Sequence, residues 1–600
     1  MVFISLYEHV CGSRTIRLKQ GMHGTLNKSR SRQAISSGEL RLRMPSSVSF
    51  WLWTMLFAMA MIAPVAAILR GSFEIAIPGS DDTRFGLDAW RQVFAEPMFL
   101  SAVVNTVGLT LATQLLALPI GIFIAWLIGR TDLPGRRHLE FCFWISFFLP
   151  ALAVLQGWIL AFDPHYGVAN SAIQRFFGPS APVFDIYSWT GIVFAHLVTT
   201  TISAKVMMLT PTFQNMDSRL EEAARVAGDG HFATLLRITI PVLAPAIAVA
   251  AIIGIMRSLE SFEIELVLGM PRRIEVYSTL IYHLTRNDPI NFAGASALGI
   301  SITSVLAWLA VLSVRIGSGG RAVTVSGHSK PARITLGPWK IPAFIFVATF
   351  AALLTVMPVA FLIASSVMTM FGFFSLESVW TTSHWTGVVA DPVFLSSFAN
   401  TLVLAIGCTF ACVIVSIAIG YTVVRSSRAA RIILDVTSWV PFTVPGILLS
   451  LAMLWLILES GSTYLYGSTV SLIVTVTLST LTLGVQLIKG SLSQIHRELE
   501  EASWVGGTST FETLWRIVLP LTARSIAVVA VMSFIAAARN ISHVALLVSS
   551  DNRPLSILQL EYMIDGHQEE AAVVGVVIVA VAVLAALLAR RLGSRIAPHA

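Results

Sequence analysis

Residues 220–247 read LEEAARVAGDGHFATLLRITIPVLAPAI, and residues 499–526 read LEEASWVGGTSTFETLWRIVLPLTARSI. Fourteen of the 28 aligned positions are identical at a constant offset of 279 residues, far more than unrelated segments give. We therefore interpret the pair as two copies of one structural unit. Each copy passes from charged to apolar residues, so an apolar span is expected to start at its proline, Pro241 or Pro520.

The similarity extends beyond these two segments. FLSAVVNT (99–106) recurs as FLSSFANT (394–401), and Pro150 recurs as Pro445, both at an offset of 295 residues. The change of offset places a deletion in the loop before residue 468. The chain is therefore a parallel duplication, which predicts a pseudo-two-fold axis along a membrane normal.

Composition places both copies in a membrane. Of the 600 residues 55% are hydrophobic and 12% charged, against about 25% charged in a soluble protein. The mean hydropathy of +0.76 indicates many membrane spans and excludes a large soluble core. Twelve apolar runs are long enough to cross a bilayer as helices: 49–69, 99–128, 141–161, 188–209, 242–268, 291–314, 341–366, 396–424, 432–458, 468–488, 525–548 and 571–589. The predicted fold is all-α, with about 12 transmembrane helices in two parallel six-helix repeats.

The predicted organisation has five parts, of which the stretch between the halves is rich in Gly, Ser and basic residues and is typical of a flexible linker. The parts are a basic tail (1–48), the first half (49–316), the linker (317–340), the second half (341–590) and a C-terminal tail (591–600).

Basic residues predict the orientation. With the N-terminus in the cytoplasm, the inside segments hold 29 Lys and Arg residues and the outside segments hold 8. This positive-inside bias predicts that both termini are cytoplasmic. The bias also accounts for the net charge of +7 without a nucleic-acid partner.

The quoted segments share the pattern Glu-Ala-(Ala/Ser)-x-x-x-Gly. Acidic residues favour a helix N-terminus, and Gly228 or Gly507 can supply the left-handed residue that ends the helix. Small side chains leave one face smooth enough for close approach by another protein. The pattern predicts a short docking helix in each half; the alternative is an ordinary interfacial loop helix.

These segments resemble the EAA loops of permeases in ATP-binding-cassette (ABC) importers of the type I fold. In that family the loop forms a coupling helix that sits in a cleft of the ATPase subunit. The residues that match the motif are Glu222, Ala223, Gly228, Pro241, Glu501, Ala502, Gly507 and Pro520. Two positions depart from it: Ser503 replaces the second Ala, and Arg524 stands where the first half keeps Pro245.

The resemblance implies a multi-pass permease subunit in a bacterial inner membrane, surrounded by lipid. Its expected partners are two copies of a cytoplasmic ABC ATPase and an external substrate-binding protein. The chain has no GxxxxGK[ST] motif, so ATP is expected on the partner subunits and no cofactor on this chain. We expect no catalytic residues and no metal site, hence a transporter and not an enzyme.

Two further stretches of sequence indicate the cargo. Residues 130–137 (RTDLPGRR) and 259–284 resemble fused permeases of ferric-iron and 2-aminoethylphosphonate uptake. Ferric iron is the first expectation, with 2-aminoethylphosphonate or a polyamine as alternatives. RTDLPGRR also partly matches major-facilitator secondary transporters, the alternative class, but the matching loop 425–431 (RSSRAAR) lacks that motif.

Charged residues inside the predicted spans point to a translocation path. A charge at mid-bilayer costs about 2.5–3.5 kcal/mol, so it tends to face a partner or a cavity. We predict that Arg257, Glu260, Glu263 and Arg539 line the path. Glu260 and Arg539 hold equivalent repeat positions and are predicted to pair across the halves; alternatively, Arg257 satisfies Glu260, and a headgroup or water satisfies Arg539. Lys205 is expected to snorkel to the interface.

Overall fold

The computed structural model describes residues 48–76, 83–286, 288, 290–319, 333–462 and 464–595. The predicted N-terminal tail up to residue 47, most of the predicted linker and the last five residues lie outside this part of the chain.

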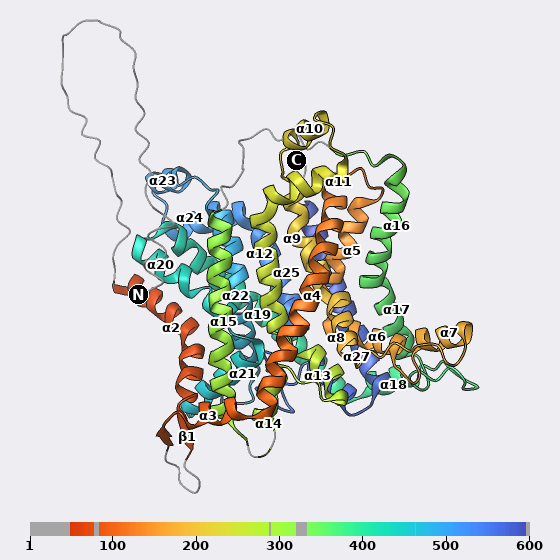
Figure 1. Ribbon diagram of the computed structural model, residues 1–600. Coiled ribbons are helices and arrows are strands. Elements are labelled where there is room, and N and C mark those ends of the chain that lie inside the picture. Colours follow the sequence, from red (N-terminus) through yellow and green to blue (C-terminus); the bar gives the residue numbers. More distant parts are fainter. Residues whose placement is uncertain are drawn as a thin grey trace, which may run out of the picture.

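Helices dominate the described residues, as predicted (Figure 1). Ten helical stretches in this part of the chain are long and apolar enough to cross a membrane, and two bent helix pairs would raise the number to twelve. In chain order, the parts of the ten are α2 (Val48–Gly71), α4 (Pro97–Arg130), α8 (Trp189–His196) with α9 (Ile202–Gln214), α11 (His231–Thr234) with α12 (Ile240–Leu259), α15 (Phe292–Gly319), α16 (Lys340–Ala351) with α17 (Met357–Ser366), α19 (Pro392–Arg425), α22 (Thr469–Leu492), α24 (Thr510–Thr513) with α25 (Leu519–Ala538), and α27 (Gln568–Arg595).

Shorter elements connect the spans. They are the antiparallel strands β1 (Glu74–Ala76) and β2 (Thr83–Phe85), and the helices α3 (Asp88–Ala95), α7 (Val168–Phe177), α10 (Arg219–Val226), α13 (Glu263–Gly269), α14 (Tyr277–Arg286), α18 (Ser383–Ala390), α23 (Glu498–Val505) and α26 (Leu555–Ile564). Figure 1 shows α10 and α23 at one end of the bundle, and β1, α3, α14, α7 and α18 at the other. We call these ends the α10 face and the opposite face.

The third and ninth predicted spans are each broken into two helices. α5 (Arg136–Phe148) meets α6 (Ala151–Phe162) at 100°, and α20 (Arg428–Thr437), continued by a 3₁₀ turn, meets α21 (Gly446–Glu459) at 109°. Both breaks fall at the repeated prolines, Pro150 and Pro445. A proline has no N–H and disfavours a helical residue before it, so the helix stops there.

The fifth and eleventh spans also differ from the prediction. Their helices run from His231 to Leu259 and from Thr510 to Ala538, so each starts ten residues before its proline and ends before the predicted limits of 268 and 548. A π-helical turn precedes Pro241 in one and Pro520 in the other. Such a turn re-routes the backbone hydrogen bonds next to a residue that cannot donate one.

The two halves interlock through equivalent elements. α2, the first span of the first half, packs against the broken-span helix α21 of the second half. α17, which belongs to the first span of the second half, packs against the corresponding helix α6 of the first half. A parallel duplication related by a near-two-fold axis produces this reciprocal exchange.

The described end of the predicted linker is attached to the first half. The backbone of Ile334 pairs with that of Arg130 and Asp132, at the end of α4. The Asp132 carboxylate accepts hydrogen bonds from the Leu336 N–H and the Lys340 ammonium, both at 3.0 Å. These two donors lower the pKa of Asp132 below its ordinary value. These hydrogen bonds therefore fix the start of the second half to the end of α4 in the first half.

Candidate coupling helices and translocation cavity

The two short helices predicted at the repeated motif are present as α10 and α23, each eight residues long. Gly228 and Gly507 follow them with φ values of 96° and 85°, the left-handed conformation that was predicted. The N–H of Asp229 donates to the carbonyl of Ala224 at 3.0 Å, which is the pattern of a Schellman termination. Both helices lie on the α10 face (Figure 1).

An arginine at the end of the second span holds α10 in place. Arg130 and Glu221 are both buried, with side chains only 1% and 4% exposed. The Arg130 guanidinium donates through Nε at 3.1 Å and through Nη2 to Glu221 Oε2, and through Nη1 at 3.0 Å to the Met216 carbonyl. Thr239 donates to the other Glu221 oxygen at 3.0 Å. The carboxylate is thus neutralised and fully hydrogen-bonded, as a buried ion pair requires.

The second half repeats this arrangement at α23. Arg425 donates to Glu500 Oε1 at 2.8 Å and to the Ile495 carbonyl at 2.9 Å. Tyr421 donates to the other Glu500 oxygen at 2.9 Å, as Thr239 does to Glu221 in the first half. We call the two arrangements the Arg–Glu clamps.

The clamps use the first glutamate of each Glu-Glu pair, which the sequence analysis did not select. Glu222 is exposed, and Glu501 pairs at 3.0 Å with Arg497, the residue just before its own helix. A usable signal exists in the sequence: both segments begin with two glutamates, and an arginine ends the preceding second span at the repeat offset of 295.

Both helices present apolar side chains outward. Val226 and Val505 occupy equivalent positions, and each is 90% exposed. Three further pairs at the same offset are also exposed. They are Leu220 and Leu499, Phe232 and Phe511, and Leu236 and Trp515. We call the two sets the α10 patch and the α23 patch. Leu220 and Val226 lie on α10, whereas Phe232 and Leu236 lie at the start of the helical stretch that follows it. The repetition of all four exposed positions in the second half argues against chance.

The two departures from the motif leave the helices alike. Ser503 turns its hydroxyl toward Thr508 and Thr513, with 3.0 Å between the hydroxyls of Ser503 and Thr513. Arg524 and Pro245 both lie inside the apolar helices that follow, α25 and α12. Ala223 and Ala502 are exposed on their respective helices.

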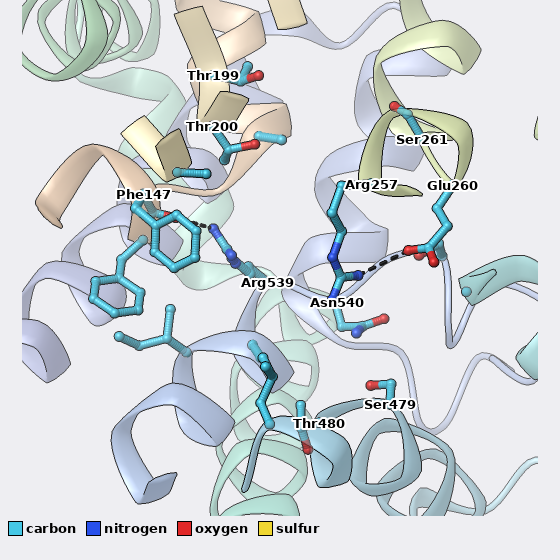
Figure 2. A pocket seen from close by; sticks show the side chains of 18 of the residues that line it. Phe147, Thr199, Thr200, Arg257, Glu260, Ser261, Ser479, Thr480, Arg539 and Asn540 are labelled. Atoms are coloured by element: carbon cyan, nitrogen blue, oxygen red, sulfur yellow. Dashed lines mark hydrogen bonds and ion pairs between the residues drawn. The ribbon is translucent and has the colours of Figure 1, made fainter. Parts of the chain in front are cut away.

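A cavity of about 390 Å³ lies between the halves. All four residues predicted for the path, Arg257, Glu260, Glu263 and Arg539, line it, together with residues of α9, α12, α22 and α25. Figure 2 shows Arg257 and Glu260 on one side and Arg539 beside Phe147 on the other. The polar lining includes hydroxyl groups from both halves and the amide of Asn540.

The predicted pair between Glu260 and Arg539 is wrong. Glu260 accepts from Arg257 Nη1 at 3.0 Å, which was the alternative. Arg539 donates to the carbonyls of Phe147 and Leu149 at 3.0 and 2.8 Å, two backbone partners that neither the prediction nor its alternative named. These carbonyls lie where α5 ends, so the helix itself supplies no N–H for them.

An arginine also contacts the broken ninth span of the second half. The Arg257 guanidinium lies 4.6 Å from the centre of the Phe442 ring, in the broken ninth span. Cation–π contacts of this length are favourable when partly desolvated. Each proline break is thus contacted by an arginine from the fifth-span position of the opposite half.

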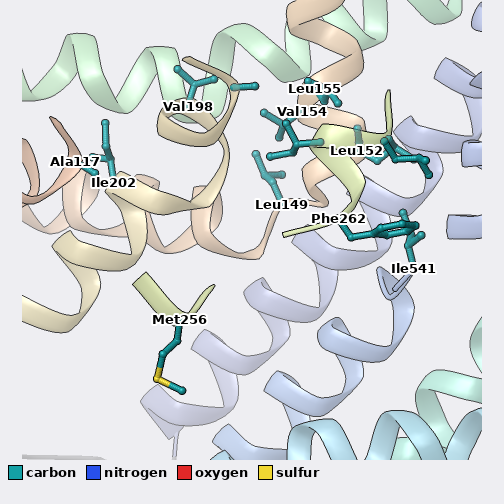
Figure 3. Packing of buried hydrophobic residues seen from close by; sticks show 14 of the residues in the cluster. Ala117, Leu149, Leu152, Val154, Leu155, Val198, Ile202, Met256, Phe262 and Ile541 are labelled. Carbon is teal, nitrogen blue, oxygen red and sulfur yellow. The ribbon is translucent and has the colours of Figure 1, made fainter. Parts of the chain in front are cut away.

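Buried hydrophobic side chains surround the cavity. Figure 3 shows Met256, Leu149, Phe262 and Ile541, which belong to one core shared by both halves. Next to the cavity, His196 Nε2 lies 2.7 Å from Glu265 Oε1, and Ser261 donates to the other oxygen of Glu265 at 2.7 Å. His196 is therefore a buried residue with a partner, as expected for a structural histidine.

Comparison with known proteins identifies the class. The family of binding-protein-dependent transport system inner membrane components matches residues 412–598. The probable ABC transporter permease protein y4fN of Sinorhizobium fredii is 26% identical over 550 residues, 88% of this chain and 93% of that protein. Residues 412–598 are a permease domain of this family, and most of the chain is similar to an ABC transporter permease. This permease contains two fused halves, and like its relatives it is a transporter subunit and not an enzyme.

Other relatives carry names of different substrates. The ferric transport system permease protein FbpB of Actinobacillus pleuropneumoniae is 25% identical over 415 residues, 66% of this permease and 57% of that protein. The molybdenum transport system permease protein ModB of Escherichia coli K12 is 29% identical over 214 residues, 35% of this permease and 90% of that protein. These matches favour the ABC class over the major-facilitator alternative.

Proposed function

We propose that this permease forms the translocation path of an ATP-driven importer, and that α10 and α23 each dock one separate ATPase subunit. The supporting observation is the duplicated pair of exposed apolar patches on helices that buried Arg–Glu clamps hold in place. An exposed patch on a loosely held loop would transmit no force. A patch on a clamped helix moves together with the span to which it is tied.

The docking helices are connected to the cavity through long helices. Arg130 joins α10 to the end of α4, and Arg425 joins α23 to the end of α19. Beyond α10 the chain turns at Gly228 and enters α11 and α12, whose end carries Glu260 at the cavity. A displacement of α10 by an ATPase would therefore reach the cavity along α12, and a displacement of α23 along α25.

The same proposal assigns the two faces. The α10 face is the cytoplasmic face, with both termini of the chain on that side, and ATP binds on the partner subunits. The opposite face meets the external substrate-binding protein. The positive-inside bias of the sequence supports this orientation.

Three cargo classes carry over from the sequence resemblance: ferric iron, 2-aminoethylphosphonate and polyamines. The similarity to a ferric transport permease supports iron, and the similarity to a molybdenum transport permease supports a small oxyanion. The chemistry of the cavity bears on this choice and is considered below.

Co-purification tests the docking role. Val226→Asp combined with Val505→Asp places a charge on the most exposed apolar residue of each patch without changing a clamp residue. We expect the affinity-tagged double variant to lose at least 90% of the ATPase subunit that the wild-type permease retains. Phe176→Asp, an 83% exposed apolar residue of α7 on the opposite face, is the matched control. Wild-type retention by the double variant would contradict the proposal.

A further inference from the structure

Lys205 lines the cavity from α9 and is only 1% exposed. The expectation that it snorkels to the interface is wrong, because its side chain runs inward between neighbouring helices. Within the described part of the chain, its ammonium group forms no hydrogen bond and no ion pair. A buried ammonium without a partner is costly, so a site that retains one has a use for its charge.

Two glycines make the space that Lys205 occupies. A Cβ atom added at Gly254 would lie 1.9 Å from Lys205 Nζ, and one added at Gly121 would lie 2.4 Å from Lys205 Cβ. The same Cβ at Gly254 would also lie 2.4 Å from Gln114 Oε1. The ammonium is therefore held next to a neutral amide and not next to a carboxylate.

The acidic residues of this region are engaged elsewhere. Glu260 bonds to Arg257, and Glu265 bonds to His196 and Ser261. Glu263 interacts electrostatically with Arg539.

The duplication does not supply the missing negative charge either, because the repeat position of Lys205 is Gly484, which also lines the cavity. The charge of Lys205 is therefore left uncompensated by the described residues.

Ser258 lies next to the amide of Gln114, whose oxygen, Oε1, accepts no hydrogen bond from the described residues. Gln114 Nε2 donates to Ser258 Oγ at 2.9 Å and to the Gly254 carbonyl at 3.1 Å. Because Ser258 accepts this bond, its own hydroxyl proton is free to be donated. Ser258 and Lys205 both line the cavity. In contrast, no cluster of three or more His, Cys, Asp or Glu side chains that could hold a metal ion occurs among the described residues.

We propose that Lys205 is a cargo-binding residue, and that it takes the oxyanion group of a small anionic or zwitterionic cargo such as a phosphonate, phosphate or sulfate. Lys is a point-charge partner for such groups, and the Ser258 hydroxyl adds a hydrogen bond. This assignment rests on the proposed function. It ranks an oxyanion cargo above a bare ferric ion or a polyamine, because a cation would meet the uncompensated charge of Lys205.

Direct binding to the full chain in lipid nanodiscs tests the assignment without any ATPase. The probes are radiolabelled phosphate, sulfate and 2-aminoethylphosphonate, with radiolabelled putrescine and ferric iron as cationic probes. We expect at least one oxyanion to bind, with an affinity at least tenfold weaker in Lys205→Met. Gly254→Ala keeps the charge but displaces the ammonium, and should weaken binding similarly. Lys340→Met, which removes a lysine paired with Asp132 outside the cavity, should bind like wild type.

Several results would overturn the assignment. They are no binding of any oxyanion to the wild-type chain, equal binding in Lys205→Met, or binding of putrescine or iron in place of the oxyanions. A monodisperse Gly254→Ala protein that binds like wild type would show that the position of the ammonium is irrelevant. Because ATPase docking is measured separately, loss of anion binding with intact docking refutes this assignment alone, and the reverse pattern refutes only the docking role.

Discussion

Two adjacent glutamates in α10 differ completely in environment. Glu221 is buried against Arg130, whereas Glu222 is exposed beside the α10 patch. Removing one partner of a buried ion pair leaves the other charge uncompensated, which costs about 3–5 kcal/mol of stability. An exposed carboxylate contributes little to stability. The inward glutamate therefore sets where the helix lies, and the outward one is free to face a partner.

We predict that Glu221→Ala releases α10 from the end of α4 and that Glu222→Ala does not. Hydrogen–deuterium exchange of residues 219–226 is the measurement. Exchange should be at least about tenfold faster in Glu221→Ala, because about 1.4 kcal/mol of lost local stability already corresponds to a factor of ten. Unchanged exchange in Glu221→Ala, or equal acceleration in both variants, would show that the clamp does not hold the helix.

At the same scale, the sequence located the charged residues of the cavity but not their partners. Arg257, Glu260, Glu263 and Arg539 could be predicted to face a cavity, since a charge is too costly to face lipid. The partners of Arg539 could not be predicted, because they are main-chain carbonyls that become available only where α5 breaks. Side-chain patterns carry no direct information about such acceptors.

At the scale of elements, periodicity and length identified the apolar runs. Where a run breaks internally depends on individual residues, here prolines. Runs 141–161 and 432–458 are long enough to span a bilayer, but length alone gives no information about a break inside a run. Pro150 and Pro445 stop those helices in the structure. Pro241 and Pro520, in contrast, lie within continuous helices that adjust through π-helical turns. A proline therefore predicts a disturbance of the helix but not which of these outcomes follows.

The turns that end α10 and α23 depend on glycine. Gly228 and Gly507 have positive φ values. A Cβ added at either position would have no neighbouring atom within 4 Å. The free-energy cost of replacing either glycine therefore comes from the backbone conformation alone. We predict that Gly228→Val costs about 1–2 kcal/mol, the penalty of a left-handed conformation, and weakens ATPase binding to nanodisc-embedded permease about 5- to 30-fold.

Gly230→Ala is the matched control for this turn. Gly230 has a φ of −71° and equally free space around its added Cβ, so its substitution should leave ATPase affinity unchanged. The ATPase affinity of Gly228→Asn should lie between those of Gly228→Val and Gly230→Ala, because asparagine tolerates the left-handed region. Wild-type affinity of Gly228→Val would mean that the turn does not fix the docking helix.

At the scale of the whole molecule, the repeat offsets predicted the parallel duplication, and the reciprocal packing of α2 on α21 and α17 on α6 agrees with it. That exchange could not be read from the sequence, since it depends on which spans of the two halves become neighbours. The same symmetry places α10 and α23 on one face, so two identical partners could bind side by side (Figure 1).

The central claim is that these two helices contact ATPase subunits at the cytoplasmic face. Cross-linking in native membranes tests it most directly, with Val226→Cys, Val505→Cys or, on the opposite face, Phe176→Cys, and a bifunctional thiol reagent added to inverted vesicles. The account predicts a permease–ATPase adduct from Val226→Cys and from Val505→Cys, and none from Phe176→Cys or from the chain without an added cysteine. Adducts from Phe176→Cys alone, or no adduct from either valine position, would contradict it.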